Sequence, residues 1–268
     1  MKNDTQDRKP EIQVGLDRVG VTNLRTLVQT RWQGHKYKFI PKIQLTVNLS
    51  HKRKGAHMSR LVEAITESIE EEAELVYESL EELGRKILLR LSDKHPYKKG
   101  EIVFETELVV EAKTPKTGRK TMETHDVTVT VSKDNGVFSK KLAAKVVGNT
   151  VCPHSMENTG GKPHIQRATA ELTVSADAGK KITLESLIKI CEQCFSSPVY
   201  TLLKTPDESK LVEDMHANPK FVEDVARGIL DKAGRKFAGA KIHVRVVSQE
   251  SIHRHDVIAE GDSPNNAF

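Results

Sequence analysis

Apolar positions that alternate with polar ones indicate the β-strands of this chain. Ile43, Leu45, Val47 and Leu49 recur at every second residue of KFIPKIQLTVNLS, as expected of a strand with one buried face. The same period predicts strands at 101–112, 125–132, 142–151, 167–176 and 240–249. Alternation of this kind is typical of antiparallel sheets with one face on the core.

A spacing of three and four residues predicts the helices. Apolar residues keep this spacing from Met58 to Ser92, so we expect one unusually long helix there. Further helical patterns occupy 183–195, 207–217 and 219–234. In the last of these, Pro219 suits the first turn and Gly234 suits the end.

The order of elements predicts the fold class and the domains. The first half gives strand, helix, strand, strand, and the second gives strand, strand, helices, strand. We therefore expect an α+β protein of two modules, 11–138 and 139–258, each an antiparallel sheet backed by helices. The segments 1–10 and 259–268 are polar and contain turn-forming residues, which predicts flexible tails.

Composition narrows the class of protein. Charged residues make up 29% of the 268 positions, and no apolar run approaches the roughly 20 residues of a membrane-spanning helix. The N-terminus lacks the apolar core of a signal peptide, and three cysteines do not suggest a disulfide framework. We expect a cytoplasmic protein with reduced thiols and no membrane partner. The net charge of +5 is compatible with an anionic ligand but names none.

The loop VCPHSMENTGGKPHIQR, at 151–167, contains more reactive side chains than a turn requires. Cys152 and His164 are metal-ligand types, although a free cysteine and surface histidines would look the same. Near the C-terminus, His253 and His255 alternate and so share one side of an extended segment. Imidazoles suit proton transfer, but two histidines at a strand end are also often merely exposed.

Other charged or thiol-bearing positions admit two interpretations. Glu208 and Glu223 lie in or near helix first turns, which favour acidic residues for structural reasons alone. KRKGAHMSR, at 52–60, combines basic side chains with a helix start and suits phosphate oxygens, or forms a solvated basic turn. Cys191 and Cys194 form C-x-x-C without a second pair, which favours core cysteines. GxGxxG, P-loop and GxSxG motifs are absent, which excludes the common dinucleotide, Walker-type and serine-hydrolase classes.

Seven motifs, taken together and in order, resemble the type IB GTP cyclohydrolase family of bacterial folate and archaeal methanopterin synthesis. They are VGV at 19–21, KGAHMSR at 54–60, VCPHS at 151–155, HIQR at 164–167, LLKTPDE at 202–208, NPKFVED at 218–224 and ESIHRHD at 250–256. They span nearly the whole chain. The resemblance implies a tunnelling fold (T-fold), a homotetramer, and active sites at module or subunit interfaces.

The resemblance also implies roles for individual residues. Metal binding falls to Cys152, Glu208 and His164, proton transfer to His164, His253, His255 and His154, guanine binding to Glu223, and triphosphate binding to Lys54, His57, Arg60 and Arg167. His154 stands where many relatives have a second cysteine. The implied cofactor is a divalent metal, Fe²⁺ first and Mn²⁺ or Zn²⁺ as alternatives, since imidazole and thiolate ligands accept each of them.

The implied reaction is metal-dependent opening of the guanine ring of GTP at C8, with release of formate. The product is 7,8-dihydroneopterin triphosphate or its 2′,3′-cyclic phosphate, and the residues do not separate the two. Two alternatives stay open: an NADPH-dependent deazaguanine-nitrile reductase of the same fold, and a nucleic-acid-binding module. The second fits the pI of 8.9. It fits poorly with an aromatic content of only 4%, because single-stranded nucleic acids stack on aromatic side chains.

Overall fold

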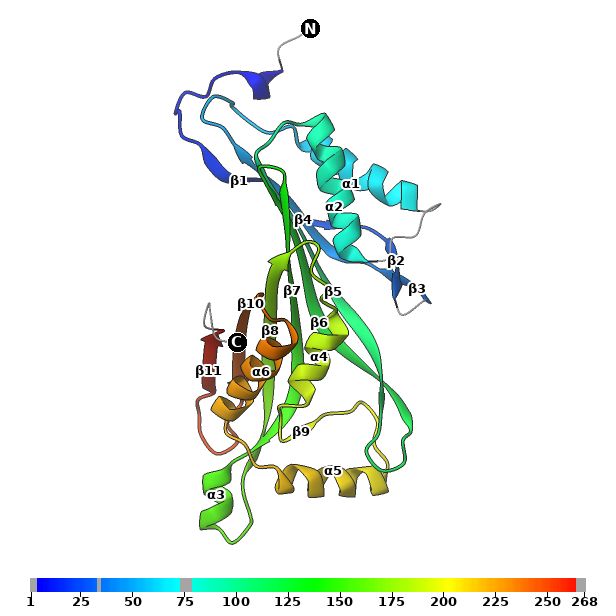
Figure 1. Cartoon of the computed structure of the whole chain (residues 1–268), viewed down its shortest axis with the longest axis vertical. Helices are drawn as coiled ribbons and strands as arrows, with labels where there is room; N and C mark the ends of the chain where they lie inside the picture. The colour runs from blue at the N-terminus through cyan, green and yellow to red at the C-terminus, as the bar shows by residue number, and fades with distance from the viewer. Residues whose placement is uncertain (1–3, 33–34, 73–78, 264–268) are drawn as a thin grey trace. The chain divides into compact units, whose positions relative to one another are not determined.

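The computed structural model describes residues 4–32, 35–72 and 79–263 (Figure 1). The elements in chain order are η1 (Thr5–Asp7), β1 (Leu16–Arg25), β2 (Val28–Trp32), β3 (His35–Phe39), β4 (Lys42–Leu49), α1 (Met58–Glu72), α2 (Leu80–Lys94), β5 (Lys99–Lys113), β6 (Lys120–Asp134), β7 (Val137–Val151), α3 (Pro153–Asn158), β8 (Ile165–Asp177), α4 (Leu184–Glu192), β9 (Ser197–Pro198), α5 (Thr205–Ala217), α6 (Val222–Lys236), β10 (Lys241–Ser248) and β11 (Val257–Asp262).

A nine-stranded sheet forms the framework. Its strand order is β1-β4-β5-β6-β7-β8-β10-β11, with β9 paired to β7, while β2 and β3 form a separate two-stranded sheet. The pairs β1/β4, β4/β5, β8/β10 and β10/β11 are antiparallel. The predicted class, α+β with antiparallel strands and helices, is confirmed.

Two compact units divide the chain. Unit 1 comprises Met1–Thr106, Thr128–Lys141 and Asp177–Gly179, and unit 2 comprises Glu107–Val127, Leu142–Ala176 and Lys180–Phe268. The long strands β5, β6 and β7 each contribute residues to both units. For this reason the division does not follow the boundary expected at residue 138.

In unit 1, α1 and α2 lie side by side and α2 packs directly on the sheet. Ile43, Leu45 and Val47 of β4 are buried, as their alternation predicted. A Cβ on Gly84 of α2 would lie 2.9 Å from Val131 Cγ2, so glycine lets the helix approach β6 closely. Burial of these apolar side chains stabilises the unit.

The single helix expected over 58–92 is wrong, because two helices occupy this stretch. The backbone of Ser79 is extended, with φ −159° and ψ 163°, which no helix interior accommodates. The Ser79 hydroxyl accepts a hydrogen bond from the Glu82 N–H over 3.2 Å and thereby caps α2. Residues 73–78 lie outside the described residues. The apolar spacing alone did not indicate that the helix is interrupted here.

In unit 2, α6 packs along β10 and β11 and beside α4 (Figure 1). Phe195 is buried against Gly148 of β7, where a Cβ would lie 2.2 Å from the ring. Both ends of α6 lie further along the chain than the expected range of 219–234. The Asp224 carboxylate accepts from the Phe221 N–H over 3.1 Å, so the helix begins at Val222, after Pro219, and it continues past the buried Gly234 to Lys236.

The tail expected from residue 259 is also shorter than predicted. Val257–Asp262 forms β11, an edge strand paired in register with β10 from His243 to Ser248. Half of its residues are exposed and none is fully buried, so no clear apolar face marked this strand in the sequence. In the described part of the chain, no helix combines the length and apolarity needed to cross a membrane.

Candidate active site

The two ends of the 151–167 loop are joined by the sheet. β7 ends at Val151 and β8 begins at Ile165, so Cys152 and His164 are the first residues beyond the neighbouring strands. The Cys152 N–H donates to the His164 carbonyl oxygen over 3.2 Å. Backbone pairing therefore holds the thiol-bearing and imidazole-bearing residues side by side.

The loop itself folds into a short helix and a glycine turn. The Cys152 Sγ accepts from the Ser155 N–H over 3.4 Å and caps α3, from which the exposed His154 projects. Gly160 and Gly161 have φ of 63° and 87°, a region that glycine occupies without strain. They return the chain to His164.

Glu223 comes to the same place from the first turn of α6. The Lys220 N–H donates to the Val151 carbonyl oxygen over 2.9 Å. The Asn218 side chain donates to the Phe195 carbonyl oxygen over 3.1 Å. The first bond fastens the segment before α6 to the end of β7, and the second fastens it to the segment that follows α4. The exposed carboxylate of Glu223 consequently lies beside the loop.

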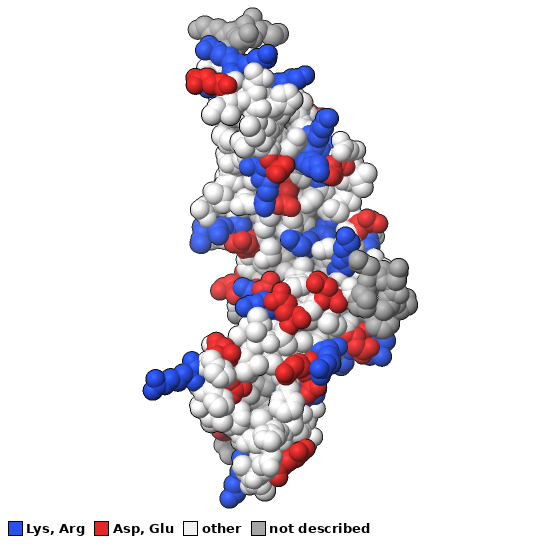
Figure 2. Space-filling view, turned by 90° about the vertical axis from the view of Figure 1, so that its left-hand side faces the viewer, with Lys and Arg blue, Asp and Glu red and all other residues white. Residues whose placement is uncertain are grey.

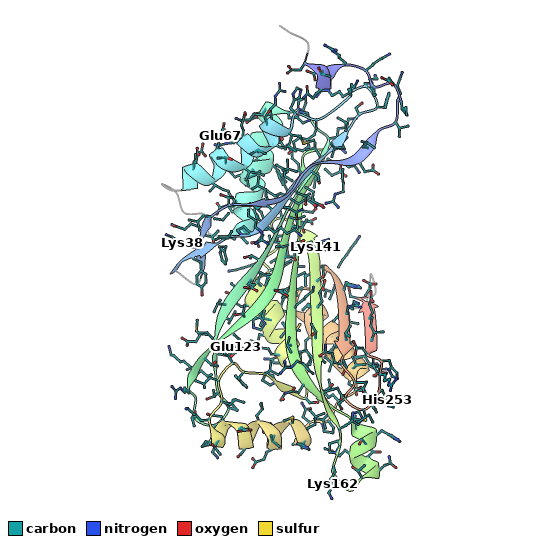
Figure 3. The ribbon with its side chains drawn as sticks, turned by 180° about the vertical axis from the view of Figure 1, so that it is seen from behind. Lys38, Glu67, Glu123, Lys141, Lys162 and His253 are labelled. Carbon is teal, nitrogen blue, oxygen red and sulfur yellow. The ribbon has the colours of Figure 1, made fainter. Side chains whose placement is uncertain are left out.

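The turn between β10 and β11 contributes two imidazoles. The rings of His253 and His255 stack with their centroids 5.1 Å apart and their planes 7° apart. Both side chains are exposed, and Figure 3 labels His253 in this turn. The rings therefore share one side, as their alternate spacing predicted.

The thiol, imidazole and carboxylate groups described above line one pocket of about 640 Å³ in unit 2. Six residues selected from the sequence line it: Cys152, His154, His164, Glu223, His253 and His255. A thiol, four imidazoles and a carboxylate around one cavity can bind a metal, accept hydrogen bonds from a ligand and move protons.

The pocket also contains a carboxylate that the sequence analysis did not select. Glu250 lies just beyond β10, and its side chain is 9% exposed. Its Oε1 accepts from Gln166 Nε2 over 3.2 Å, and Gln166 Oε1 lies 3.0 Å from His164 Nδ1. Glu250 begins the quoted ESIHRHD motif, but nothing in its spacing indicated a partner on β8.

Two of the expected site residues do not line this pocket, although both belong to unit 2. Glu208 is exposed in the first turn of α5. Its neighbour Asp207 is buried and accepts hydrogen bonds from Lys116 N–H at 3.0 Å and from Thr117 N–H and Oγ1, both at 2.8 Å. Arg167 is exposed on β8, where it alternates with the buried Gln166 and so faces away from it.

Three of the four residues expected to bind triphosphate, Lys54, His57 and Arg60, belong to unit 1. Lys54 is exposed, whereas His57 is buried. Asp4, Asp7 and His57 place their ligand atoms within 4.8 Å of one another, the one such cluster among residues 4–32, 35–72 and 79–263. Arg60 lies 3.7 Å from the Asp4 carboxylate, and Arg53 lies 3.9 Å from that of Asp7. Because guanidinium groups already face both carboxylates, we interpret the cluster as an ion-pair network.

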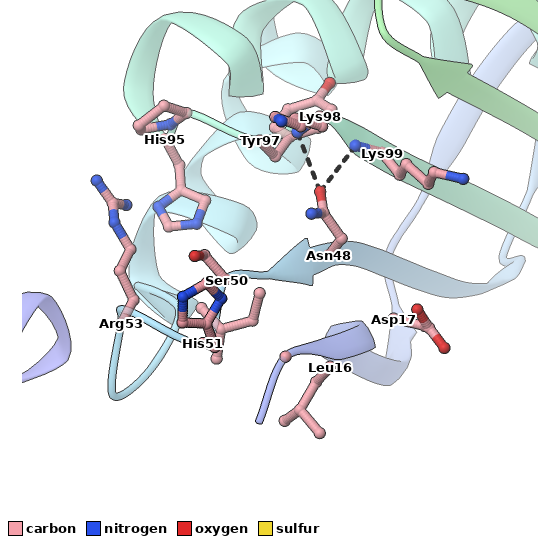
Figure 4. A pocket seen from close by; sticks show the side chains of 13 residues that line it. Leu16, Asp17, Asn48, Ser50, His51, Arg53, His95, Tyr97, Lys98 and Lys99 are labelled. Carbon is pink, nitrogen blue, oxygen red and sulfur yellow. Dashed lines mark hydrogen bonds between the residues drawn. The ribbon is translucent and has the colours of Figure 1, made fainter. Parts of the chain in front are cut away.

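Unit 1 has a pocket of its own, of about 680 Å³ (Figure 4). Asn48 Oδ1 accepts from the N–H groups of Lys98 and Lys99, over 3.0 and 2.8 Å, and ties β4 to the start of β5. His95 lines this pocket and is 1% exposed. Burial lowers the pKa of His95, and the nearby Arg53 lowers it further. None of the residues selected from the sequence lines it.

The unit 2 pocket fits a divalent metal better than the unit 1 cluster does. Thiolate and imidazole are the ligands that Zn²⁺ and Fe²⁺ accept, and Cys152 and His164 supply both. The buried hydrogen-bonded partners behind His164 are typical of a metal-binding histidine. Among residues 4–32, 35–72 and 79–263, no third His, Cys, Asp or Glu joins Cys152 and His164 in a group whose ligand atoms all lie within 4.8 Å of one another.

Comparison with solved structures shows that the fold is shared with uricase. Uricase from Arthrobacter globiformis superposes with a TM-score of 0.60, over 97% of this chain and 97% of that one, at 6% identity. A hyper-thermostable mutant of that uricase superposes with a TM-score of 0.53 at 8% identity, over 93% of this chain and 92% of that one. Identities this low show the fold alone.

Sequence comparison gives the family. The model of type I GTP cyclohydrolase folE2 matches residues 2–259. GTP cyclohydrolase MptA of Pyrococcus abyssi is 52% identical over 261 residues, covering 96% of this chain and 98% of the relative. GTP cyclohydrolase MptA of Thermococcus kodakarensis is 51% identical over 262 residues, covering 96% of this chain and 98% of the relative. The chain belongs to the type I GTP cyclohydrolase family.

Proposed function

We propose that this chain is a GTP cyclohydrolase whose reaction takes place in the unit 2 pocket. The enzyme opens the imidazole ring of guanine at C8, releases formate and yields a 7,8-dihydroneopterin phosphate. The observation that carries the assignment is convergence: six residues from four separate sequence motifs line one pocket. The family supports the same reaction and does not favour the reductase or nucleic-acid alternatives.

Glu223 binds the guanine base in this proposal. A carboxylate accepts two parallel N–H donors, and the N1–H and N2–H groups of guanine form such a pair. Glu223 lies in the first turn of α6, where its negative charge is also favoured by the helix dipole. The base is thereby oriented with its opposite edge, which includes C8, free to meet the other residues of the pocket.

Cys152 and His164 hold a divalent metal, with Fe²⁺ the first choice and Mn²⁺ or Zn²⁺ the alternatives. When bound, such an ion supplies Lewis acidity and lowers the pKa of a coordinated water. Glu208 is the third ligand in the proposal. Because it is exposed and lies outside the pocket of its own chain, we infer that it reaches the site of a second copy in a homotetramer.

The histidines carry the protons. His253 and His255 are exposed and stacked at the pocket, so a proton accepted by one ring passes readily to solvent or to the other. His154 projects from α3 into the same space, where a relative with a second cysteine would present a thiol. Opening the ring and releasing formate both require protons at nitrogen, which imidazoles supply near neutral pH.

The triphosphate and the product form the remaining parts of the proposal. Lys54, His57, Arg60 and Arg167 are the proposed triphosphate ligands, and the T-fold tetramer is the assembly that would bring residues of both units to one substrate. Figure 2 shows Lys and Arg side chains interspersed with Asp and Glu over the visible face, with no extended basic track for a nucleic acid.

Since the relatives at 50 to 52% identity are named MptA, we propose the methanopterin-type product, the 2′,3′-cyclic phosphate.

The decisive experiment is anaerobic incubation of purified protein with GTP and Fe(II), Mn(II) or Zn(II). Formate is quantified and the pterin is identified by mass. Formate with pyrophosphate and a cyclic phosphate is the expected result. Formate with an intact triphosphate would correct the product, and no formate with any metal would refute the function.

A pair of thiol variants tests the pocket itself. Cys152→Ala is expected to abolish formate release and metal retention while the oligomeric state, measured by light scattering, stays unchanged. Cys194→Ala, which removes a buried thiol outside the pocket, serves as the matched control and is expected to retain both. Full activity of Cys152→Ala would remove the thiol from the mechanism.

A further inference from the structure

We propose that Glu250 is a positioning residue that fixes the tautomer of His164, acting through the amide of Gln166. The inference deepens the proposed function, because it takes His164 to be a metal ligand. Glu250 itself need touch neither the metal nor the substrate.

The position of Glu250 follows from strand pairing. Ser248 of β10 lies opposite Ala168 of β8, and beyond the strand the Gln249 N–H donates to the Arg167 carbonyl oxygen over 2.8 Å. The antiparallel register therefore continues for one more step. A second step in the same register puts Glu250 opposite Gln166, where the two side chains meet at 3.2 Å.

The hydrogen bonds that link His164, Gln166 and Glu250, called here the Glu250–Gln166 row, can run in only one direction. A carboxylate only accepts, so Glu250 must receive its bond from the amide nitrogen of Gln166. The amide oxygen of Gln166 is then the atom at 3.0 Å from His164 Nδ1. An oxygen in that place requires a donor, which puts a proton on Nδ1 and, in the neutral imidazole, leaves Nε2 with its lone pair.

A second observation shows that the carboxylate is directed at the histidine. Glu250 Oε2 is buried, lacks a hydrogen-bond partner and lies 3.6 Å from His164 Nδ1. That separation is too long for a hydrogen bond but keeps a negative charge next to the N–H. Leaving a buried carboxylate oxygen unpaired is unfavourable for folding, so its retention beside a proposed ligand favours a functional role.

His164 is therefore held in the tautomer that can bind a metal even before the metal is present. Nε2 can bind a metal only when it is unprotonated, and the Glu250–Gln166 row selects that form. Carboxylates placed behind metal-binding histidines commonly change metal affinity by about 10- to 100-fold. We expect Glu250→Gln to weaken metal binding in this range, because a glutamine no longer dictates which way the Gln166 amide points.

Metal affinity of the full-length protein is the direct test, measured by Co(II) titration with the visible spectrum as readout and by competition with a chelator. Glu171→Gln is the matched control, since Glu171 is a carboxylate on β8, the strand of Gln166, and lies outside the pocket. Its affinity is expected to equal that of the wild type. Thermal melts of the metal-free proteins report any structural effect separately.

A double variant that exchanges the two side chains distinguishes a role in hydrogen-bond direction from a role in packing. In Gln166→Glu/Glu250→Gln, the carboxylate accepts from His164 Nδ1–H and the new glutamine donates to it, so the polarity towards the histidine is restored. We expect the double variant to regain most of the affinity that Glu250→Gln loses. A role in packing alone would predict additive losses instead.

The outcomes separate this inference from the proposed function. Wild-type affinity in Glu250→Gln, or no recovery in the swapped variant, overturns the inference while formate release by the wild type stands. If the wild type binds metal but releases no formate, the proposed function fails and the affinities still decide the role of Glu250. A wild type that binds no divalent metal overturns both.

Discussion

Glu223→Gln gives the sharpest test of guanine recognition. Glutamine retains one acceptor oxygen and replaces the other with a donor, so one of the two bonds to the base is lost. Hydrogen bonds to a charged group contribute about 1.5–3 kcal/mol each. Because Glu223 is exposed to water in the single chain, we take the lower half of this range. At about 1.4 kcal/mol per tenfold, kcat/KM for GTP should fall about 10- to 40-fold.

The substrate provides the control for this variant. Inosine triphosphate lacks the 2-amino group and offers only N1–H, which the remaining oxygen of glutamine can accept. The penalty of Glu223→Gln on kcat/KM, measured by formate release, should therefore be below about threefold with inosine triphosphate. Asp231→Asn, a change of a carboxylate later in α6 and outside the pocket, should leave kcat/KM unchanged. Equal penalties with both substrates, or a penalty below twofold with GTP, would refute the reasoning.

Two further predictions concern stability and reactivity. Burial raises the pKa of Asp207, but hydrogen bonds from Thr117 and Lys116 outweigh it and lower the pKa from 3.8 to about 2. Asp207 therefore stabilises the fold above pH 3.8, and the contribution disappears as the pH falls towards 2. In thermal melts, Asp207→Asn should be less stable than the wild type at pH 6, and the difference should shrink between pH 4 and pH 2; a constant difference would contradict the assignment. Burial raises the pKa of the Cys191 and Cys194 thiols, and Cys191 is fully buried. Iodoacetamide should thus label Cys152 in the native protein and reach the other two only after unfolding, as mass spectrometry would show.

The sequence was most informative for site residues whose relative positions follow from a local pattern in the chain. Cys152 and His164 directly follow and precede strands that alternate clearly, so their proximity could be expected. His253 and His255 share a side because they are two residues apart. These relations need no knowledge of distant contacts, because the period of the strand determines them.

Long-range pairing accounts for what the sequence did not show. Glu250 meets Gln166 across 84 positions of the chain, and only the register of β10 on β8 brings them together. The break before α2 depends on the extended backbone of Ser79, whereas the flanking apolar spacing fits one continuous helix equally well. Glu208 was selected by resemblance, and the fold of a single chain leaves it outside the pocket.

The backbone bond between Cys152 and His164 has a consequence for how the loop can vary. Both residues stand at the base of the loop, where the sheet sets their separation, and the glycine turn at Gly160 and Gly161 lies at the far end. Doubling the length of a flexible loop costs only about 0.6 kcal/mol. Insertions at the turn would therefore lengthen the loop while Cys152 and His164 keep their spacing, so the outer part of the loop and these two pocket residues can vary independently.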